Sequence, residues 1–483
     1  MPVPSITPCS DPFPLCVDLD GTLIKTDLSW ESLVRLLRHN PFWILPVLFW
    51  RARGRTHLNQ QLARRTALDS ATLPYHKPFV AFLQEQKNAG RKLVLVTASD
   101  RDLALAVAKH VGLFDEVLGS DGKTNLCGGD RLKVLTDKFG DRGFDYAGNS
   151  PDDLHIWRGA REAIVVNAGR SLENQAGRCA KPGRVFAPES HRLRSFFQCL
   201  RPHQWVKNLI IFVPAVAAHR LAEPLVLWRE SWAFLIFCLC ASGVYIVNDL
   251  ADLDADRRHP AKRQRPFASG DLPLQAGLVA GPLLLIAGLF LAAQLSWHFA
   301  GVAALYLALT TSYSWRVKQL VLLDVFFLAG LYTIRLVAGH AAADVAYSSW
   351  LLMFSMFIFL SLALVKRYVE LDATQPVASG ESLPGRGYTL DDLAVVTSLG
   401  TSSGYLAALV LALYADSQQV MILYAHPTRL LLVCPLLLYW ISRMWLLAHR
   451  RQMHDDPVVF ALKDPASYVI AALALVVLRL ATG

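Results

Sequence analysis

Residues 15–23 read LCVDLDGTL, a short apolar run that leads into an acidic loop containing glycine. The apolar run predicts a buried strand. The carboxyl end of such a strand is where α/β sheets place their chemistry. Asp18 and Asp20 follow the run directly, so we expect both carboxylates at that edge of a sheet.

Two later stretches repeat this pattern of a buried strand followed by polar residues. Residues 92–96 read KLVLV and end in TASD, and residues 144–147 read FDYA and end in GNSPDD. Helical patterns lie before and after the second strand. The alternation of strand and helix predicts a doubly wound parallel sheet of the α/β class.

Together with Lys133, which lies between the last two stretches, these elements resemble the four motifs of haloacid dehalogenase-type phosphatases, over residues 14–170. The resemblance implies that Asp18 is the nucleophile and forms an aspartyl phosphate. It implies that Asp20 is the general acid and then the general base. Thr97 is expected to hydrogen-bond the phosphoryl group, and Lys133 to balance its charge.

The resemblance also implies a Mg²⁺ site, because phosphoryl transfer needs a cation to neutralise the phosphate. The implied ligands are Asp18, Asp20, Asn149 and Asp153, with Asp152 nearby. Asn149 stands where the family usually has an aspartate, and an amide oxygen can bind Mg²⁺ but brings no charge. This difference leaves open a weak or vestigial phosphatase with a regulatory role.

The composition predicts a membrane part after this domain. With 483 residues and 53% hydrophobic residues, the chain exceeds one ordinary soluble domain. No signal peptide opens the chain, so we expect the N-terminal domain in the cytosol. We expect a phosphatase-like domain at 1–180 with a helical cap at about 24–90, a linker and interfacial helix at 181–200, and a transmembrane domain at 201–483.

The expected cap contains PFWILPVLFW at residues 41–50, followed by Arg51 and Arg53. The run is too short to span a bilayer and is broken by Pro46. Its tryptophans and flanking arginines suit a membrane interface. An ordinary cap core is the alternative, and both interpretations remain open.

The C-terminal part predicts an all-α, polytopic membrane domain of about nine transmembrane helices. If the N-terminus is cytosolic, the even-numbered connections return to the cytosol, and these are rich in Lys and Arg, as the positive-inside rule requires. We therefore expect a multi-pass protein of the inner membrane with its soluble domain and sites in the cytosol. The segments are 208–221, 231–248, 273–295, 299–314, 320–342, 348–366, 392–414, 429–448 and 466–482.

The net charge of +9 does not indicate nucleic acid as a partner. The Lys and Arg residues lie largely beside the apolar segments, where anionic lipid and topology explain them. The sequence contains no nucleic-acid-binding motif. The expected partners are therefore a membrane and phosphorylated substrates.

The strongest chemical signal is NDLADLDAD at residues 248–256. On a helix, Asp249, Asp252 and Asp256 are spaced by three and four residues and share one face. Carboxylates stacked in this way repel one another unless a divalent cation lies among them. The pattern therefore predicts Mg²⁺ holding a diphosphate. A solvated acidic loop is the alternative.

A second polar cluster, of Tyr313, Lys318 and Asp324, follows two segments later. Arg335 lies about three helical turns beyond Asp324, where an unpaired guanidinium in hydrocarbon would be costly, so we expect it to face a cavity and pair with a phosphate or carboxylate. The two acidic clusters resemble the UbiA superfamily of intramembrane transferases, over residues 197–482. That resemblance implies an all-helical fold of nine spans around a central cavity.

Less general stretches resemble one branch of this superfamily, the decaprenyl-phosphate phosphoribosyltransferases. They are RPHQWVKN at 201–208, HPAKRQRP at 259–266, Lys366-Arg367 with Glu370, and DDPVVF at 455–460. This resemblance implies Mg²⁺-dependent transfer of 5-phosphoribose from phosphoribosyl diphosphate to a polyprenyl phosphate. The implied catalytic residues are Asp249, Asp252, Asp256 and Asp324. The implied substrate-binding residues are Lys207, Asn208, Asn248, Lys262, Arg265, Tyr313, Lys318, Arg335, Lys366 and Arg367.

The product of that transfer keeps a 5-phosphate, which the phosphatase-like domain is expected to remove. Two alternatives stay open. In one, the membrane part prenylates an aromatic acceptor, and the same aspartates bind an allylic diphosphate. In the other, the N-terminal domain is a catalytically weak binding or regulatory module.

Overall fold

The computed structural model describes residues 13–120, 126, 128–188, 192–373, 386–453 and 456–482, with the side chains of Arg55 and Gln419 left aside. The chain divides into two compact units. One comprises Met1–Leu200 with Tyr245–Ala280, and the other comprises Arg201–Val244 with Gly281–Gly483. We call them the sheet unit and the helical unit.

The sheet unit contains one parallel sheet of six strands in the order β3-β2-β1-β4-β5-β6. The first strand lies in the interior, paired with β2 on one side and β4 on the other. This order confirms the predicted doubly wound α/β fold. The strands are β1 (Leu15–Asp18), β2 (Leu93–Asp100), β3 (Glu116–Ser120), β4 (Asp145–Gly148), β5 (Glu162–Val166) and β6 (Lys181–Phe186).

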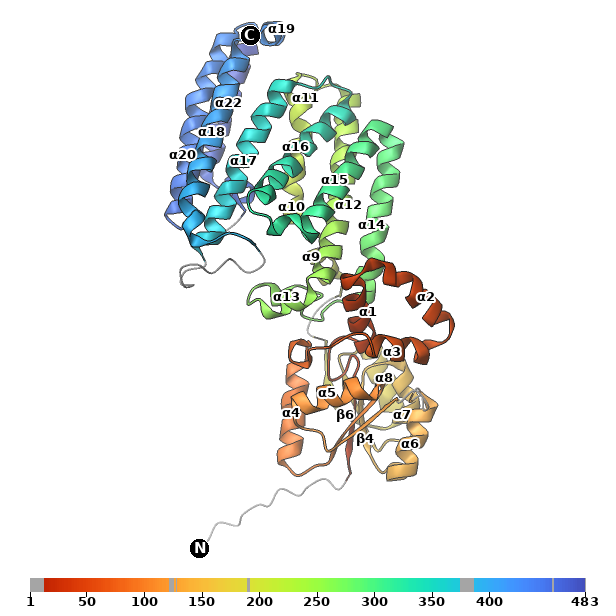
Figure 1. The fold of residues 1–483 in the computed structure, drawn as a ribbon. Helices are drawn as coiled ribbons and strands as arrows, with labels where there is room; N and C mark the ends of the chain where they lie inside the picture. Colours follow the sequence, from red (N-terminus) through yellow and green to blue (C-terminus); the bar gives the residue numbers. More distant parts are fainter. Residues whose placement is uncertain are drawn as a thin grey trace. The chain divides into compact units, whose positions relative to one another are not determined.

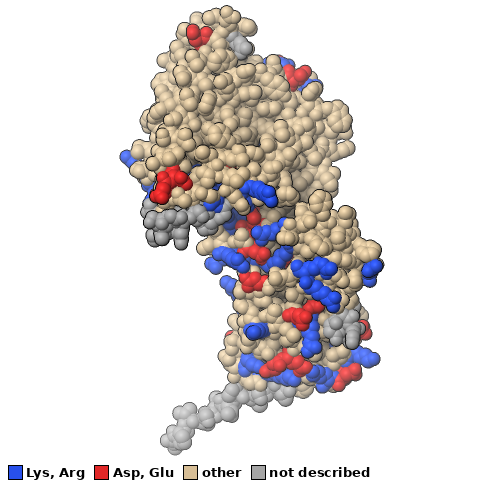
Figure 2. Space-filling view, viewed as in Figure 1, with Lys and Arg blue, Asp and Glu red and all other residues tan. Residues whose placement is uncertain are grey.

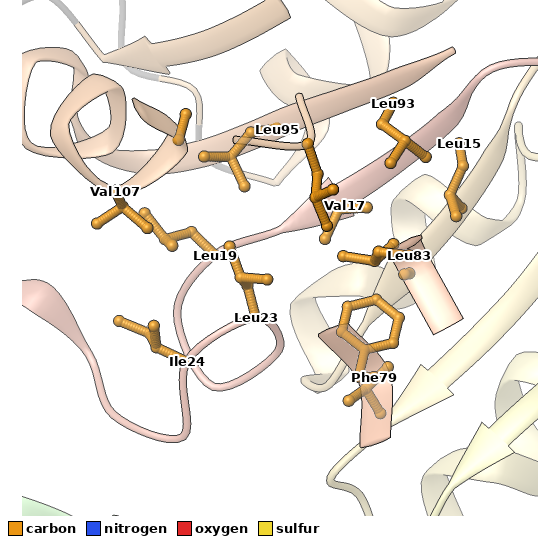
Figure 3. Packing of buried hydrophobic residues seen from close by; sticks show 14 of the residues in the cluster. Leu15, Val17, Leu19, Leu23, Ile24, Phe79, Leu83, Leu93, Leu95 and Val107 are labelled. Carbon is orange, nitrogen blue, oxygen red and sulfur yellow. The ribbon is translucent and has the colours of Figure 1, made fainter. Parts of the chain in front are cut away.

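The sheet is buried on both faces because helices cover each of them (Figure 1). On one face, Leu15 and Val17 of β1 pack with Leu93 and Leu95 of β2 and with Phe79 (Figure 3). On the other face, the alternate strand residues form a second cluster. The helices are α4 (Lys77–Asn88), α5 (Arg101–Val111), α6 (Gly129–Phe139), η3 (Pro151–Asp153), α7 (Leu154–Trp157) and α8 (Arg170–Cys179).

A helical cap is inserted between β1 and α4. It begins with α1, where the Asp27 side chain accepts a hydrogen bond from the Ser29 amide at 2.8 Å and caps the helix. The predicted cap extended to about residue 90, but α4 packs on the sheet through Phe79 and Leu83. The inserted helices are α1 (Leu28–His39), η1 (Pro41–Trp43), α2 (Ile44–Ala52), α3 (Arg55–Ala63) and η2 (Ser70–Thr72).

The sheet unit also takes in residues 245–280, which include the predicted diphosphate motif. This segment holds the last turns of α12 (Pro224–Ala251), α13 (Leu253–Arg258), η5 (Lys262–Gln264) and the first turns of α14 (Leu274–Leu295). A short helix, α9 (Arg192–Leu200), lies where the sequence predicted an interfacial helix. Its basic side chains Arg192 and Arg194 are exposed.

The helical unit is built from long apolar helices that run side by side (Figure 1). Few charged side chains show on its surface in Figure 2, whereas both signs are frequent over the sheet unit. The helices are α10 (Pro202–Trp205), η4 (Val206–Phe212), α11 (Val213–Ala217), α15 (Trp297–Trp315), η6 (Val317–Gln319), α16 (Leu323–Ala343), α17 (Ser349–Asp372), η7 (Leu390–Asp392), α18 (Leu393–Ala415), α19 (Gln418–Leu423), η8 (Pro427–Leu432), α20 (Val433–His449), α21 (Pro457–Ala461) and α22 (Pro465–Thr482).

Seven helices among the described residues are long and apolar enough to cross a membrane. The nine predicted spans are therefore not confirmed. Segment 208–221 folds as the short elements η4 and α11, and segment 299–314 is α15, whose 19 residues include His298 and a polar run from Thr310 to Ser312. Helix α15 is therefore long enough to cross a membrane, but its mean hydropathy is too low for a span.

Candidate functional site

Polar side chains from three strand ends meet at one pocket of about 330 Å³ in the sheet unit. Asp18 is the last residue of β1, and Asn149 follows β4 directly. These two side chains line the pocket together with Asp20, Ser99 and Asp153. Because parallel strands end at the same edge, the sheet topology brings these groups together.

Asp20 is held in place from both the sheet and the cap. The Leu28 amide at the start of α1 donates to its Oδ1 at 2.8 Å, and the hydroxyl of Ser99 donates to its Oδ2 at 2.6 Å. Thr97 also donates to Oδ2, at 3.1 Å, and is fully buried beneath the pocket rather than on its wall. Burial, reinforced by nearby Asp27, raises the pKa of Asp20 to about 6. A carboxyl group in that range can both give and take a proton near neutral pH.

Asp18 faces a guanidinium inside the pocket. The Arg131 Nη1 lies 2.8 Å from Asp18 Oδ1, and the Thr22 hydroxyl donates to Oδ2 at 3.2 Å. Burial raises the pKa of Asp18 well above its usual value, and the charge of Arg131 acts in the opposite direction. The carboxylate that resembles the family nucleophile is therefore paired with one cation.

Lys133 was predicted to balance the charge of the phosphoryl group, but the structure places it away from this pocket. Lys133 is exposed on α6, away from the pocket lining, whereas Arg131 is buried. Two positions on a helix that are two residues apart point in nearly opposite directions. The sequence signal was available, since Arg131 lies in the same GDRLK stretch.

Asp153 is anchored mainly by its own loop. Its Oδ2 accepts hydrogen bonds from the amides of Asn149 and Ser150, both at 2.9 Å, and its Oδ1 accepts one from Tyr146 at 3.0 Å. The Asn149 side chain packs against Gly21, where an added Cβ would lie 1.9 Å from the Asn149 amide nitrogen. Gly21, with φ +79°, is thus required for this close approach.

The pocket has room for a positive charge between the carboxylates of Asp18 and Asp153. Arg131 Nη1 lies 2.8 Å from Asp18 and 3.6 Å from Asp153, so one guanidinium pairs with both carboxylates. In the described part of the chain, no group of three or more His, Cys, Asp or Glu side chains is arranged around a common metal position. The two carboxylates and the Asn149 amide would have to share Mg²⁺ with a phosphate oxygen or water, which this ion accepts.

The predicted diphosphate motif lies at the junction of α12 and α13. Arg265 Nη1 is 3.0 Å from Asp249 Oδ1 and 2.7 Å from Asp256 Oδ2, so the two carboxylates converge on one atom. The helix is interrupted between them, since α12 ends at Ala251 and Asp252 is the N-cap of α13. The amide of Asp252 still donates to the Asn248 carbonyl at 2.8 Å, so the turn continues through the interruption.

The environment of this motif is cationic and partly buried. Asp249 and Asp256 are buried, whereas Lys262 on η5 is exposed. Burial raises the pKa of Asp256, and Arg265 acts in the opposite direction. Asp249 and Asp256 would hold Mg²⁺ only with further oxygen ligands from phosphate or water, because no group of three or more His, Cys, Asp or Glu side chains gathers around a metal position among the residues that the structure describes.

The second predicted acidic residue, Asp324, lies in a buried ion network of the helical unit. Arg367 forms an ion pair with its Oδ2, and the Tyr388 hydroxyl donates to its Oδ1 at 2.7 Å. Arg386 lies 3.6 Å from the same carboxylate and donates to the Tyr313 hydroxyl at 3.1 Å. Both carboxylate oxygens of Asp324 therefore have protein partners.

A basic cluster in the helical unit gathers several predicted substrate-binding residues. Asp456 Oδ2 lies 2.9 Å from Lys207 Nζ and 3.1 Å from Lys366 Nζ. Burial favours the protonated form of Asp456, but Lys366 and Lys207 hold its pKa well below the usual range. Asp456 was not predicted as a site residue, although it stands in the DDPVVF stretch. Its neighbour Asp455 lies outside the described residues.

Arg335 joins this cluster from α16. Its Nε donates to Asn208 Oδ1 at 2.9 Å, and its guanidinium carbon lies 5.2 Å from the Tyr306 ring centroid and 5.6 Å from that of Tyr332. Lys207 also lies over the Tyr332 ring, at 5.7 Å. Two lysines thus pair with one carboxylate, and Arg335 shares the Tyr332 ring with Lys207, which leaves positive charge for an anion. Lys318, on η6, is half-buried and is not among these contacts.

Comparison with known proteins agrees with both halves of the chain. Residues 209–464 match the model of the UbiA prenyltransferase family, and residues 15–158 match that of the haloacid dehalogenase-like hydrolases. A protein of uncharacterized function from Sinorhizobium fredii, y4nM, is 39% identical over 95% of this chain and 89% of its own length.

Two further relatives match a smaller share of this chain. The nodulation protein NoeC of Azorhizobium caulinodans is 39% identical over 58% of this chain and 91% of its own length. The decaprenyl-phosphate phosphoribosyltransferase of Mycolicibacterium smegmatis is 33% identical over 45% of this chain and 69% of its own length.

Proposed function

Because the chain belongs to the UbiA prenyltransferase family and carries a haloacid dehalogenase-like hydrolase domain, we propose that it performs two consecutive steps on one membrane lipid. The membrane part transfers 5-phosphoribose from phosphoribosyl diphosphate to a polyprenyl phosphate. The hydrolase domain then removes the 5-phosphate. The name of the mycobacterial relative supports the first step.

The observation that carries the transferase proposal is the convergence of Asp249 and Asp256 on Arg265, within 3.0 Å of one nitrogen. Two buried carboxylates held this close need a cation, and a diphosphate ligand needs the same cation. Mg²⁺ bound here would neutralise the diphosphate as it leaves the sugar. Arg265 then remains beside the diphosphate as a second positive group.

The transfer itself forms one bond and breaks one. An oxygen of the polyprenyl phosphate attacks the anomeric carbon of the ribose, and the bond from that carbon to the diphosphate breaks. Lys207 and Lys366, which share the single carboxylate of Asp456, and Arg335, which is held by Asn208, supply the positive charge that would hold a phosphate group for this attack.

The hydrolase step uses the pocket at the ends of β1 and β4. Asp18 attacks the phosphorus atom while Asp20 gives a proton to the departing sugar oxygen. Water then attacks the aspartyl phosphate, Asp20 takes a proton from it, and inorganic phosphate leaves. Arg131, 2.8 Å from Asp18, is the group that stabilises the transferred phosphoryl.

The two steps take place at the cytosolic face of the inner membrane in this proposal. The Lys and Arg bias of the connections and the location of residues 245–280 within the sheet unit both support it. Both acidic sites would then meet substrates from the same compartment.

Purified full-length protein in nanodiscs, given radiolabelled phosphoribosyl diphosphate and a polyprenyl phosphate, tests the proposal. Wild-type protein should make a labelled lipid, and chelation of Mg²⁺ should abolish it. Asp249→Asn should lower the rate on the order of 100-fold or more, because it removes charge that acts on the leaving diphosphate. The control is Asp416→Asn, which changes an exposed carboxylate after α18.

Two results would overturn the proposal. One is the absence of labelled lipid together with prenylation of an aromatic acceptor from a polyprenyl diphosphate. The other concerns the hydrolase domain: if Asp18→Asn leaves the lipid product unchanged, that domain has no catalytic part in the sequence.

A further inference from the structure

The pocket at Asp18 has a third wall that comes from outside the hydrolase domain. Besides the sheet and the cap residues Trp30 and Asn59, its lining includes Arg192 of α9 and residues 273–275. Leu274 is the first residue of α14, which has the length and hydropathy of a membrane span. One helix thus begins in the hydrolase pocket and continues as a span.

This wall is fixed to the cap by ion pairs with the segment that precedes it. Arg257 holds Glu31 with two hydrogen bonds, of 2.6 and 3.0 Å, and the Glu31 side chain is 0% exposed. Arg35 contacts Glu31 at 3.0 Å and also Asp254 at 2.6 Å. A buried carboxylate between two guanidinium groups tolerates little displacement, because losing a partner leaves a buried charge.

Close packing continues along the same segment. Gly270 has φ +77°, and an added Cβ would lie 2.7 Å from the Lys25 side chain and 3.1 Å from Pro74. Leu278 in α14 packs against the cap cluster that contains Leu33 and Trp50. The segment therefore contacts the cap at Asp254, Arg257, Gly270 and Leu278.

The start of a membrane span fixes the depth of the pocket. A helix of 22 residues is about as long as the hydrocarbon core is thick, so its first turn lies at the level of the lipid headgroups. A pocket lined by that turn can receive a phosphate ester on a headgroup without removing the lipid from the membrane. Its lining is mostly polar, which suits a sugar and not a prenyl chain.

We propose that this pocket is a composite site for a phosphomonoester on a lipid-linked sugar, and that Pro273, Leu274, Gln275 and Arg192 form the wall that selects a membrane-anchored ester. Glu31 is a positioning residue, which holds this wall against the cap through Arg257. The proposal rests on the hydrolase step described above and adds its substrate class and the residues that choose it.

The test uses the full-length protein in nanodiscs with three esters. Synthetic farnesylphosphoryl ribose 5-phosphate is the anchored ester, ribose 5-phosphate is the soluble one, and p-nitrophenyl phosphate reports the chemistry at Asp18 alone. The wild type should have a higher kcat/KM for the anchored ester than for ribose 5-phosphate. Gln275→Ala should raise the KM for the anchored ester about fivefold, the range of one lost hydrogen bond, and leave kcat unchanged.

Glu31→Gln should give the same rise in KM, and kcat/KM for p-nitrophenyl phosphate should stay within about twofold of the wild type, a difference below half a kcal/mol. The double variant with Arg257→Gln should lose no more than Glu31→Gln alone, because both residues act through one contact. Matched controls are Gln84→Ala and Glu85→Gln, two exposed residues of α4 that lie outside the pocket.

Each other outcome overturns a stated part. If both variants leave the KM for the anchored ester unchanged, or if the wild type prefers soluble ribose 5-phosphate, the composite site is wrong while the hydrolase step stands. If the wild type hydrolyses none of the three esters, the hydrolase step fails, and this proposal fails with it.

Discussion

Arg131 and Lys133 are both cations of α6, and their different environments determine which of them can act on a phosphate. Arg131 lies between Asp18 and Asp153, whereas Lys133 is exposed. A guanidinium can hold two phosphate oxygens at once, which an ammonium group does less well. We therefore propose that Arg131, and not Lys133, balances the charge of the phosphoryl group.

Arg131→Ala should lower kcat/KM for p-nitrophenyl phosphate on the order of 100-fold, because it removes a preorganised charge beside the transferred phosphoryl. Lys133→Ala should leave the same constant close to that of the wild type. Phosphate release by the purified full-length protein measures both. Equal losses in the two variants would contradict the assignment.

Glu230 is a buried carboxylate of a different kind. Its two oxygens lie inside the helical unit, and no hydrogen-bond partner contacts them within the described part of the chain. Asp464, by contrast, forms hydrogen bonds of 2.6 and 3.0 Å with Arg443. Replacing an unpaired carboxylate with an amide removes no ion pair, whereas replacing a paired one leaves a cation without its partner.

Glu230→Gln should therefore leave the thermal unfolding temperature in detergent unchanged or raise it. Asp464→Asn, the matched control, should lower it by several degrees, about what a loss of 1–2 kcal/mol produces. Light scattering during a thermal ramp follows both variants. If Glu230→Gln lowers the unfolding temperature as much as Asp464→Asn does, the Glu230 carboxylate has a stabilising partner and the prediction is wrong.

Individual site residues were predictable only where a motif or a spacing named them. The convergence of Asp249 and Asp256 follows from helical periodicity, and the pocket residues Asp18 and Asn149 follow from the shared edge of parallel strands. The sequence carried no such signal for the pairs of Asp456 with Lys366 and of Glu31 with Arg257, whose members lie 90 and 226 positions apart in the chain. Only tertiary packing reveals pairs of that kind.

At the scale of elements, the helical register of the diphosphate motif was predicted, and its interruption at Asp252 was not. The amides of Asp252 and Asp256 each donate to a carbonyl four residues earlier, so the turn is kept although the helix assignment breaks. Asp254, which was not expected on the shared face, pairs with Arg35 of the cap. Periodicity alone does not identify a partner 219 positions away in the chain.

The exposure of apolar side chains on the cap helix α2 and the turn before it favours a membrane interface over an ordinary cap core. Val47 and Trp50 are buried in the cap, but Phe42, Leu45 and Leu48 are 78%, 66% and 60% exposed. An apolar face of this size, followed by two exposed arginines, is typical of a helix at a membrane interface.

A nitroxide label placed by Leu45→Cys, in a protein whose other cysteines are replaced, tests that face in nanodiscs. The label should be accessible to oxygen and protected from a water-soluble nickel complex, because it would lie among lipid chains. A label at Gln84, exposed on α4, serves as the aqueous control. Equal accessibility at the two positions would show that α2 faces water.

At the scale of the whole molecule, the sequence predicted an α/β part followed by a helical membrane part, and the structure and the family matches confirm both. The location of residues 245–280 in the sheet unit was not predictable. Apolar runs in the sequence indicate where spans lie. Contacts between a connecting loop and a distant domain produce no periodic pattern in the sequence. The number of spans is uncertain from hydropathy for a similar reason, since α15 mixes apolar and polar residues.

The most direct test of the central claim is mass spectrometry of the lipid that the intact protein makes from a polyprenyl phosphate and phosphoribosyl diphosphate. The wild type should yield a ribosyl lipid without a 5-phosphate, Asp18→Asn the same lipid with the 5-phosphate retained, and Asp249→Asn neither. A wild-type reaction that yields no ribose-containing lipid would contradict the account.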